Sequence, residues 1–224
     1  MIIRVEKKIE DLVIGLLGFR NQFLVDVLQR NDLTNFKVLS SYEEISEEHD
    51  IVFLSGVHFI LPEDYLSKPT YGVYCFHESP LPEGRGSAPI HWAVSNKRPN
   101  LTVSLFEADA KIDKGYIAVQ VNVPIKKTDV YFDLERKRSE GICTAFEIFL
   151  EELKQGCIVL RKQTGSSSYN KKRSVADSEL DINKPLVELW DHIRICDNEK
   201  FPAYFKIDNR KIILNYRVED DNSN

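Results

Sequence analysis

Residues 50–77 are DIVFLSGVHFILPEDYLSKPTYGVYCFH, and this stretch gives the strongest indication of the fold class. It contains two short apolar segments, Asp50–Ser55 and Gly72–His77, with a helix start at Pro62 between them. Segments that are apolar on both faces are typical of strands in a parallel sheet buried between helices. Proline is well tolerated in the first turn of a helix. The stretch therefore predicts a strand–helix–strand unit whose second strand ends at His77.

The same alternation extends toward the N-terminus. Leu12–Leu17 (LVIGLL) predicts a central strand, and Phe19–Arg30 predicts a helix because its apolar residues recur at helical spacing. Phe36–Leu39 predicts a further strand, while the acidic Tyr42–His49 fits either a short helix or a loop. This rhythm favours an α/β fold with a doubly wound, mostly parallel sheet.

The second half of the chain changes pattern, because two strands there predict an antiparallel pair around a turn at residues 113–115. The predicted elements, in chain order, are a helix at Ala88–Ser95, strands at Leu101–Glu107 and Ile117–Ile125, a long helix at Asp133–Lys154, a surface loop at Gln163–Arg173, a helix at Pro185–Cys196, and a hairpin of Ala203–Ile207 with Lys211–Val218. We expect a core at residues 1–160, an extension at 161–218 built of this last helix and hairpin, and a disordered tail at 219–224.

Composition limits the class of protein. The 224 residues carry 30 Lys and Arg against 35 Asp and Glu, a formal net charge of -5 that disfavours a general nucleic-acid binder. No apolar run approaches the roughly 20 residues that span a bilayer, and the N-terminal stretch is too charged for a signal peptide. The four cysteines form no CxxC pair, so we expect reduced thiols and no metal site. We expect a cytoplasmic protein without membrane or nucleic-acid partners.

The segment with the most candidate binding and catalytic residues is Tyr74–Ile90, YCFHESPLPEGRGSAPI. His77 leaves a buried strand at its carboxyl end, where open α/β sheets bind ligands, and an imidazole there can exchange protons near neutral pH. The Gly84-Arg85-Gly86 run offers a cation and accessible backbone amides, which suit an anionic group. The alternative is that the loop only connects two elements and that His77 only caps a strand. Residue chemistry alone leaves both open.

A second candidate segment is Asp109–Ile117, DAKIDKGYI. Asp113 lies between two predicted strands and directly precedes Lys114 and Gly115. Aspartate is common in turns for local hydrogen-bonding reasons, so a turn aspartate and a functional carboxylate are both consistent with this segment.

Taken together, the two segments carry a family resemblance. The pattern H-x-S-x-L-P-x-x-R-G-x-x-P-I, followed by D-x-G-x-I, resembles the catalytic domain of formyltransferases that use N10-formyltetrahydrofolate. Its members here are His77, Ser79, Leu81, Pro82, Arg85, Gly86, Pro89, Ile90, Asp113, Gly115 and Ile117. Ser55–Pro62 (SGVHFILP) resembles the family's pterin loop. Tyr169–Asp181 resembles a segment of the methionyl-tRNA and sugar enzymes, and His192–Ile212 resembles the end of the sugar enzymes.

The resemblance implies a Rossmann-like core and a sugar N-formyltransferase. Such an enzyme moves a formyl group from N10-formyltetrahydrofolate to the amine of a nucleotide-linked amino sugar for surface polysaccharide, such as the O-antigen of lipopolysaccharide. The tRNA enzymes carry a further C-terminal barrel, for which this chain leaves no room after the hairpin. The purine-pathway enzymes lack a counterpart to Tyr169–Asp181. The resemblance also implies a homodimer, with the helix and hairpin of the extension as its contact, and no metal.

The resemblance assigns roles to single residues. It implies His77 and Asp113 as catalytic, with His77 stabilising developing charge or moving protons and Asp113 orienting it. It implies folate contacts from His58, Phe59, Ile60, Leu61 and Asp109, and substrate contacts from Ser79, Pro82, Arg85 and Gly86. For Arg85, a contact with the sugar-nucleotide phosphate and a role that only braces the loop are both open.

Position 75 departs from the family pattern. Cys75 stands where the family carries an asparagine whose amide donates to the oxyanion, and a thiol is a weak donor. Three hypotheses remain: another donor serves the oxyanion, the enzyme is slow or uses another acyl donor, or the site only binds ligand. The family has no covalent thiol step. The alternatives to sugar formylation are a formyltetrahydrofolate hydrolase and a non-catalytic folate or sugar-nucleotide binding protein.

Overall fold

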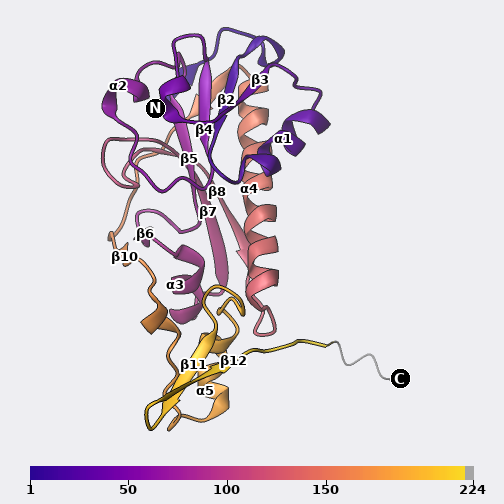
Figure 1. The fold of residues 1–224 in the computed structure, drawn as a ribbon. Helices are drawn as coiled ribbons and strands as arrows, with labels where there is room; N and C mark the ends of the chain where they lie inside the picture. The colour runs from indigo at the N-terminus through magenta and orange to yellow at the C-terminus, as the bar shows by residue number, and fades with distance from the viewer. Residues whose placement is uncertain (220–224) are drawn as a thin grey trace.

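The computed structural model describes residues 1–219 and contains a six-stranded central sheet (Figure 1). Its strand order is β3-β2-β4-β5-β7-β8. The strands are β2 (Ile14–Leu17), β3 (Phe36–Leu39), β4 (Ile51–Leu54), β5 (Val73–His77), β7 (Asn100–Glu107) and β8 (Ile117–Pro124). The pairs from β3 to β5 are parallel, and β7 and β8 add two antiparallel pairs. The predicted mostly parallel α/β sheet is confirmed.

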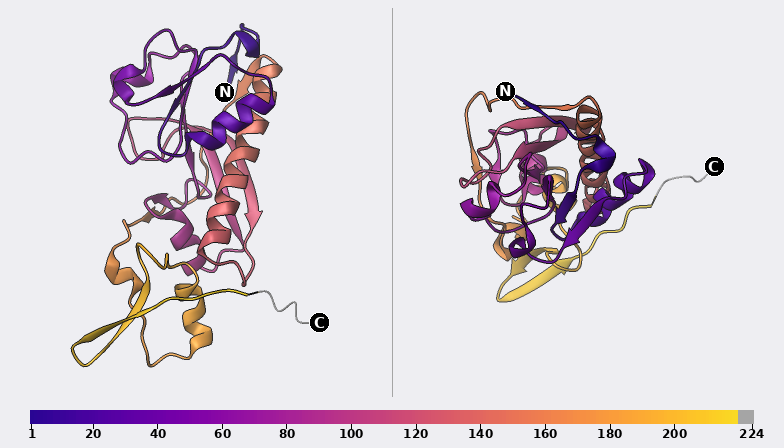
Figure 2. Two further views of the ribbon diagram at one scale, coloured as in Figure 1. Left: turned by 45° about the vertical axis from the view of Figure 1, so that its right-hand side comes forward. Right: turned by 90° about the horizontal axis from the view of Figure 1, so that it is seen from above.

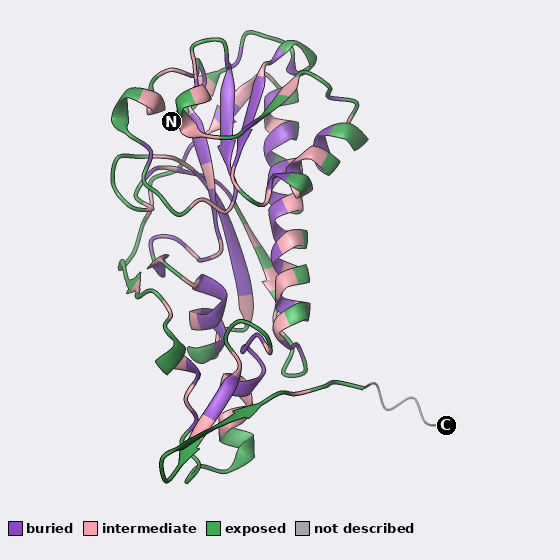
Figure 3. Cartoon of the chain, viewed as in Figure 1, coloured by how far each residue is buried: buried purple, intermediate pink, exposed green. Residues whose placement is uncertain are grey.

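Helices cover both faces of this sheet, as a doubly wound fold requires. They are α1 (Asn21–Arg30), α2 (Glu63–Leu66), α3 (Pro89–Ser95) and α4 (Tyr131–Lys154), with short 3-10 turns η1 (Ile9–Asp11) and η2 (Tyr42–Glu44). α1 and α4 lie along one face, where the largest core cluster is buried (Figure 3). α2 and the loop before it cover the other face around Leu54, Leu61 and Val73. No helix in residues 1–219 is long and apolar enough to cross a bilayer.

Two small strand pairs were not predicted. β1 (Ile2–Arg4) pairs with β9 (Cys157–Val159), and β6 (Arg85–Gly86) pairs in parallel with β10 (Tyr169–Asn170). The predicted surface loop over Gln163–Arg173 is exposed or half-buried and lacks regular structure except at β10, which is hydrogen-bonded to the loop after β5. Strands of two or three residues are too short to show the alternation by which a strand is recognised.

The extension lies at one end of the molecule, beyond α3 (Figures 1 and 2). It contains the 3-10 turn η3 (Val175–Ser178), α5 (Leu186–Ile193), β11 (Ala203–Ile207) and β12 (Arg210–Leu214). The predicted helix and hairpin are thus present, although β12 ends four residues before Val218. Leu180, Ile193, Cys196 and Ala203 form a separate small core there. Of the predicted tail, Glu219 is exposed and outside any helix or strand, and residues 220–224 lie outside the described part of the chain.

Candidate active site

Strand β5 turns two residues of the predicted site to the same face of the sheet. Side chains alternate along a strand, so Cys75 and His77 share one face while Tyr74 and Phe76 share the other. Tyr74 and Phe76 pack on Phe149 and Phe146 of α4. Cys75 and His77 therefore face away from α4. They lie at the carboxyl end of the last parallel strand, with β4 on one side and β7 on the other.

The loop after β5 holds the ring of His77. Its Nε2 donates to the carbonyl oxygen of Gly84 at 2.9 Å, which requires the proton of the neutral ring to be on Nε2. Ser104 of β7 fixes the same loop by donating through its hydroxyl to the carbonyl oxygen of Ser79 at 2.6 Å. Nδ1 accepts no hydrogen bond from residues 1–219, so its lone pair is left for a ligand or water.

Asp113 approaches the same ring from the connection between β7 and β8. Its Oδ2 lies 3.9 Å from His77 Nε2 and accepts the Gly86 N–H at 2.8 Å. The backbone of Asp113 has a φ of 51°, a left-handed conformation that aspartate tolerates better than most residues. Gly115 permits the turn, because a Cβ at this position would lie 1.6 Å from the carbonyl oxygen of Glu107. The two predicted catalytic residues are thus brought together.

Cys75 lies two residues before His77 in an apolar setting. It is half-buried beside Leu81, Phe106 and Ile117, and its thiol donates weakly to the Phe76 carbonyl oxygen at 3.7 Å. Burial raises the pKa of the Cys75 thiol far above its ordinary value, and the negative charges of Asp113 and Glu78 raise it further. The thiolate is the nucleophilic form of cysteine, so this environment disfavours a covalent thiol step.

The predicted folate loop borders a second apolar cluster, against which Cys75 also packs. Leu61 is buried together with half-buried Cys75 and Ala108, and Ala108 N–H donates to the Val73 carbonyl oxygen at 2.7 Å, which brings Asp109 next to β5. His58 packs on the ring of Phe19 and Phe59 on the ring of Tyr42, with centroid separations of 5.3 and 5.6 Å. Phe59 and Ile60 are exposed at the rim. Leu61 and Asp109 thus lie beside the strand that carries Cys75 and His77, while His58 and Phe59 pack toward Phe19 and Tyr42.

The comparison with protein families agrees with this geometry. Residues 10–142 match the family model described as formyl transferase, and this segment contains the predicted folate loop, His77 and Asp113. The chain belongs to the formyl transferase family. Methionyl-tRNA formyltransferase of Geobacillus sp. (strain WCH70) is 32% identical over 165 residues, which cover 72% of this chain and 51% of that protein. The chain thus spans about half the length of the curated relatives it matches.

Solved formyltransferases share the fold of this chain. A 4-N formyltransferase from Francisella tularensis superposes with a TM-score of 0.77 at 17% identity, covering 93% of this chain and 98% of that one. The formyltransferase PseJ from Anoxybacillus kamchatkensis, solved with UDP-4,6-dideoxy-4-formamido-L-AltNAc and tetrahydrofolate, gives a TM-score of 0.58 at 22% identity over 71% of this chain and 85% of that one.

The loop of this formyl transferase family member has the features that a folate needs. A pterin is a flat ring with apolar faces and hydrogen-bonding edges. Leu54, Leu61 and Cys75 supply an apolar wall, and within residues 1–219 the backbone N–H groups of residues 56–61 donate to no protein group. Backbone polar groups require a partner, so this loop is available to water or to the edge of a ring. The residues present therefore fit the predicted formyl donor.

The four predicted substrate residues lie in the loop after β5. Ser79 and Pro82 are buried within it, and the Ser79 hydroxyl has no partner in the described chain. Gly86 contacts Asp113 directly. The Arg85 side chain turns to the segment around β10, where Nη2 donates to Gln163 Oε1 at 2.5 Å and Nη1 to the Tyr169 hydroxyl at 3.4 Å. The hydrogen bond from Arg85 lowers the pKa of Tyr169.

Sequence inspection missed Gln163. Its Nε2 donates to the carbonyl oxygens of Asp113 and Gly115, both at 2.8 Å. It lies in a Ser- and Lys-rich segment without periodicity, and no local signal distinguishes it from a surface glutamine.

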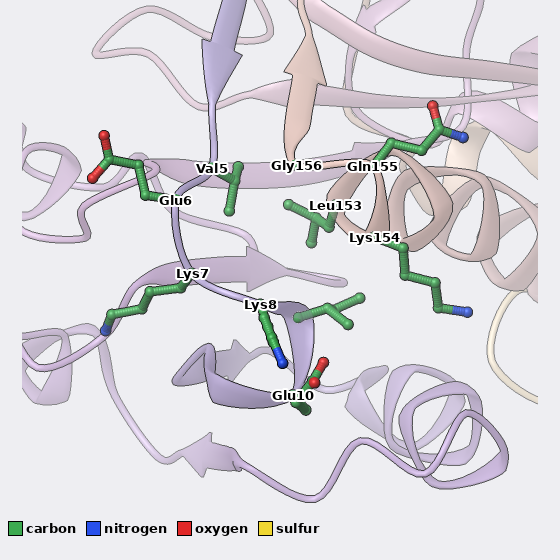
Figure 4. A pocket seen from close by; sticks show the side chains of 10 residues that line it. Val5, Glu6, Lys7, Lys8, Glu10, Leu153, Lys154, Gln155 and Gly156 are labelled. Atoms are coloured by element: carbon green, nitrogen blue, oxygen red, sulfur yellow. The ribbon is translucent and has the colours of Figure 1, made fainter.

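A hollow of about 640 Å³ lies away from this site (Figure 4). It is bounded by residues 5–10 and 153–156, near the amino end of β2, whereas His77 lies at the carboxyl ends of the parallel strands. It contains none of the predicted site residues, and no group of His, Cys, Asp and Glu in residues 1–219 is arranged to hold a metal ion.

Proposed function

We propose that this chain is an N-formyltransferase that moves the formyl group of N10-formyltetrahydrofolate to the amine of a nucleotide-linked amino sugar. The observation that carries the proposal is the His77–Asp113 pair, fixed by Gly84 and Gly86 beside a loop with free backbone donors. Both residues lie inside the segment that defines the family. A role in surface polysaccharide such as O-antigen and a cytoplasmic location are parts of the same proposal.

Transfer to an amine sets two tasks for the protein. A proton must leave the attacking nitrogen and reach N10 of the folate as the bond between N10 and the formyl carbon breaks, and negative charge on the formyl oxygen must be stabilised. The folate supplies the one-carbon group. The Nδ1 lone pair of His77 suits the first task, because Nε2 already carries the ring proton toward Gly84. Once Nδ1 is protonated, the ring is a cationic donor suited to the second task, and the Asp113 carboxylate stabilises that cation from 3.9 Å.

A sugar acceptor is supported by one of the solved formyltransferases that share this fold. The match to the Francisella tularensis enzyme takes in 93% of the chain, and the match to a methionyl-tRNA formyltransferase from Clostridium thermocellum takes in the same share, so coverage does not separate the two acceptors. PseJ was solved with a formylated UDP-sugar and tetrahydrofolate. By sequence, methionyl-tRNA formyltransferases of Geobacillus sp. and Bacillus thuringiensis match 72% and 68% of the chain. Methionyl-tRNA is therefore the acceptor to be tested against the sugar.

One observation favours a different function. Cys75 offers only a neutral thiol on the face where the family pattern has an amide donor. Loss of one preorganised donor typically slows acyl transfer by about 100- to 1,000-fold. A protein that binds folate or a sugar nucleotide without turnover, or a slow hydrolase that uses water as the acceptor, would tolerate this substitution.

The proposal extends to a homodimer through the extension. β12 pairs only with β11 among residues 1–219, so its outer edge is open, and Ile213 on it is 55% exposed. On α5, Val187 is 83% exposed. An open apolar edge can pair with a second copy of itself about a two-fold axis. Light scattering on the purified chain should give twice the mass of one chain, and Ile213→Lys should shift it to the monomer.

The function is tested by incubating the purified chain with N10-formyltetrahydrofolate and a panel of acceptors. The panel contains nucleotide-linked 3-amino and 4-amino sugars, methionyl-tRNA, and a sample without acceptor, all read by mass spectrometry. A nucleotide sugar heavier by one formyl group supports the proposal. Formylated methionyl-tRNA would contradict the sugar assignment, formate release without acceptor would indicate the hydrolase, and folate binding without any product would indicate a binding protein.

A further inference from the structure

A short segment outside the family-defining residues holds the two catalytic loops together. Residues 163–170, here called the strap, lie beyond the matched segment 10–142. The end of the strap binds the loop that contacts His77: Gly84 N–H donates to Ser168 Oγ at 2.8 Å, Arg85 N–H to the Ser168 carbonyl oxygen at 3.0 Å, and Asn170 Nδ2 to the Gly84 carbonyl oxygen at 3.2 Å. The strap therefore contacts the carbonyl oxygen that accepts the hydrogen bond from His77.

The start of the strap binds the other catalytic loop through one side chain. Gln163 Nε2 donates to the carbonyl oxygens of Asp113 and Gly115, both at 2.8 Å, while its Oε1 accepts from Arg85 Nη2 at 2.5 Å. An amide nitrogen has two hydrogens, so both donors of Gln163 are used. One side chain thus joins Arg85 of the histidine loop to the turn that carries Asp113.

The orientation of this amide follows from its partners. A flipped amide would direct Oε1 at two carbonyl oxygens and Nε2 at a guanidinium, with repulsion at every contact. A carboxylate in the same place would keep the contact with Arg85 but would have no hydrogen for either carbonyl. Glutamine is therefore the only common side chain of this shape that satisfies both loops.

The turn that carries Asp113 needs the hydrogen bonds from Gln163. Asp113 has a φ of 51°, and residues other than glycine in this conformation persist where the surroundings hold them. Its carboxylate is held by Gly86 N–H and its carbonyl by Gln163, so the backbone and side chain of Asp113 have separate anchors. Without the second anchor the turn can relax and move the carboxylate away from His77.

We propose that Gln163 is a positioning residue that holds the Asp113 carboxylate at His77, an inference that rests on the proposed transfer reaction. Gln163 does not contact the ring of His77 and acts through the backbone of Asp113. Misplacement of a catalytic group by about 1 Å typically costs about 100-fold in rate. Loss of the two donors should therefore lower kcat by about 10- to 100-fold and leave KM for folate and acceptor within about twofold.

The kinetic test compares Gln163→Glu and Gln163→Ala with Thr164→Ala, an exposed neighbour in the same strap. Both Gln163 variants should lose kcat, because both lack the donors, and Thr164→Ala should match the wild type. Adding Gln163→Glu to the Asp113→Asn variant should cause no further loss of kcat, because a residue that acts through the Asp113 carboxylate has no effect once that carboxylate is gone. A Gln163→Glu enzyme with wild-type kcat, or an additive loss in the double variant, would overturn the inference.

Hydrogen exchange of the Gly86 amide separates this inference from the proposed function, because it needs no turnover. Asp113 Oδ2 protects this amide in the wild type. Exchange should be faster in both Gln163 variants and unchanged in Thr164→Ala. A wild type that transfers no formyl group but shows this pattern refutes the reaction and keeps the structural link. Equal Gly86 exchange in all four proteins refutes the positioning role whatever the activity.

Discussion

The two faces of strand β5 are built in different ways. On one face Tyr74 and Phe76 pack into an aromatic cluster with Phe53, Phe146 and Phe149, and four of these five side chains are almost fully buried. On the other face Cys75 and His77 meet loops that come from distant parts of the chain. Neighbouring residues of one strand therefore pack into the core on one side and, in the proposed reaction, supply the chemistry on the other.

The two faces differ in how easily one contact can replace another. Aromatic packing on the α4 side depends on volume and shape, and each ring has several neighbours. The face of β5 that carries Cys75 and His77, here called the site face, depends on single hydrogen bonds. Examples are the bond from Gly86 N–H to Asp113 and the bond from His77 to the Gly84 carbonyl oxygen. A substitution on the first face should change the free energy of unfolding, and a substitution on the second should change the rate of transfer.

The largest effect should follow from a change to Asp113. Asp113→Asn keeps an acceptor for Gly86 N–H but removes the charge that stabilises the His77 cation. We expect kcat to fall by about 100- to 10,000-fold, with the midpoint of chemical unfolding almost unchanged. Steady-state kinetics with denaturation curves would show this. A large loss of stability with normal kcat in the folded fraction would contradict the separation of the two faces.

The aromatic face should give the opposite result. Phe146→Ala removes a fully buried ring from the cluster around Phe53 and should lower the free energy of unfolding by about 3–5 kcal/mol. The folded fraction should keep its kcat. Phe132→Ala, at an exposed position of the same helix, is the matched control and should change stability by less than about 0.5 kcal/mol. Equal losses of unfolding free energy in both variants would mean that the aromatic cluster does not stabilise the core.

Two glycines sharpen the comparison within the site face. Gly86 and Gly165 have φ values of 96° and 99°, but a Cβ on Gly86 would lie 2.6 Å from the Asn170 carbonyl oxygen, whereas a Cβ on Gly165 would meet nothing within 4 Å. Gly86→Ala should lower kcat by about tenfold or more, because it displaces the amide that holds Asp113. Gly165→Ala should leave kcat unchanged, with a backbone strain of about 1–2 kcal/mol in both variants. A similar kcat loss in both would assign the effect to strain alone.

Position 75 tests whether the site face still accepts the family pattern. Cys75→Asn places an amide donor on the face of His77, and we expect turnover to rise by about tenfold if it reaches the formyl oxygen. Cys75→Ala, which offers no donor, should stay within about twofold of the wild type. An unchanged or lower rate in Cys75→Asn would show that the surrounding Leu81, Phe106 and Ile117 have closed around the thiol.

The smallest effect concerns alkaline stability. Burial raises the pKa of Cys75 in the folded chain, so above a thiol's ordinary value of about 8.5 the unfolded chain releases a proton that the folded chain keeps. The contribution of this thiol to the free energy of unfolding is therefore complete below that pH. Above that pH the free energy of unfolding declines by at most about 1.4 kcal/mol per pH unit for this group. Cys75→Ala should flatten the decline between about pH 8.5 and 10 in denaturation curves. An unchanged slope would mean that the thiol ionises freely.

The sheet could be predicted from sequence because its strands carry their own signal. LVIGLL, DIVFLS and GVYCFH are apolar on both faces, and the structure has β2, β4 and β5 there. The long pair β7–β8 and the helix α4 were equally visible from alternation and helical spacing. His77 and Asp113 were found through a family pattern, and the structure shows them 3.9 Å apart.

The remaining contacts could not be predicted because they are tertiary. The β6–β10 pair has two residues on each strand, and its partners are more than 80 residues apart in the chain. Gln163 is a polar residue in a polar segment, and only the approach of two loops reveals its role. Arg85, predicted to contact substrate, contacts Gln163 and Tyr169, and its role toward a ligand stays a prediction.

A catalytic role for His77 is tested by the rate of formyl transfer to an amino-sugar nucleotide by the wild type and by His77→Ala, with the folded fraction of each measured in the same buffer. We expect formylated product from the wild type and a rate at least about 100-fold lower from the variant, at equal folded fraction. Transfer at the wild-type rate by His77→Ala would contradict that role, because the chemistry would then lie elsewhere than on the site face of β5.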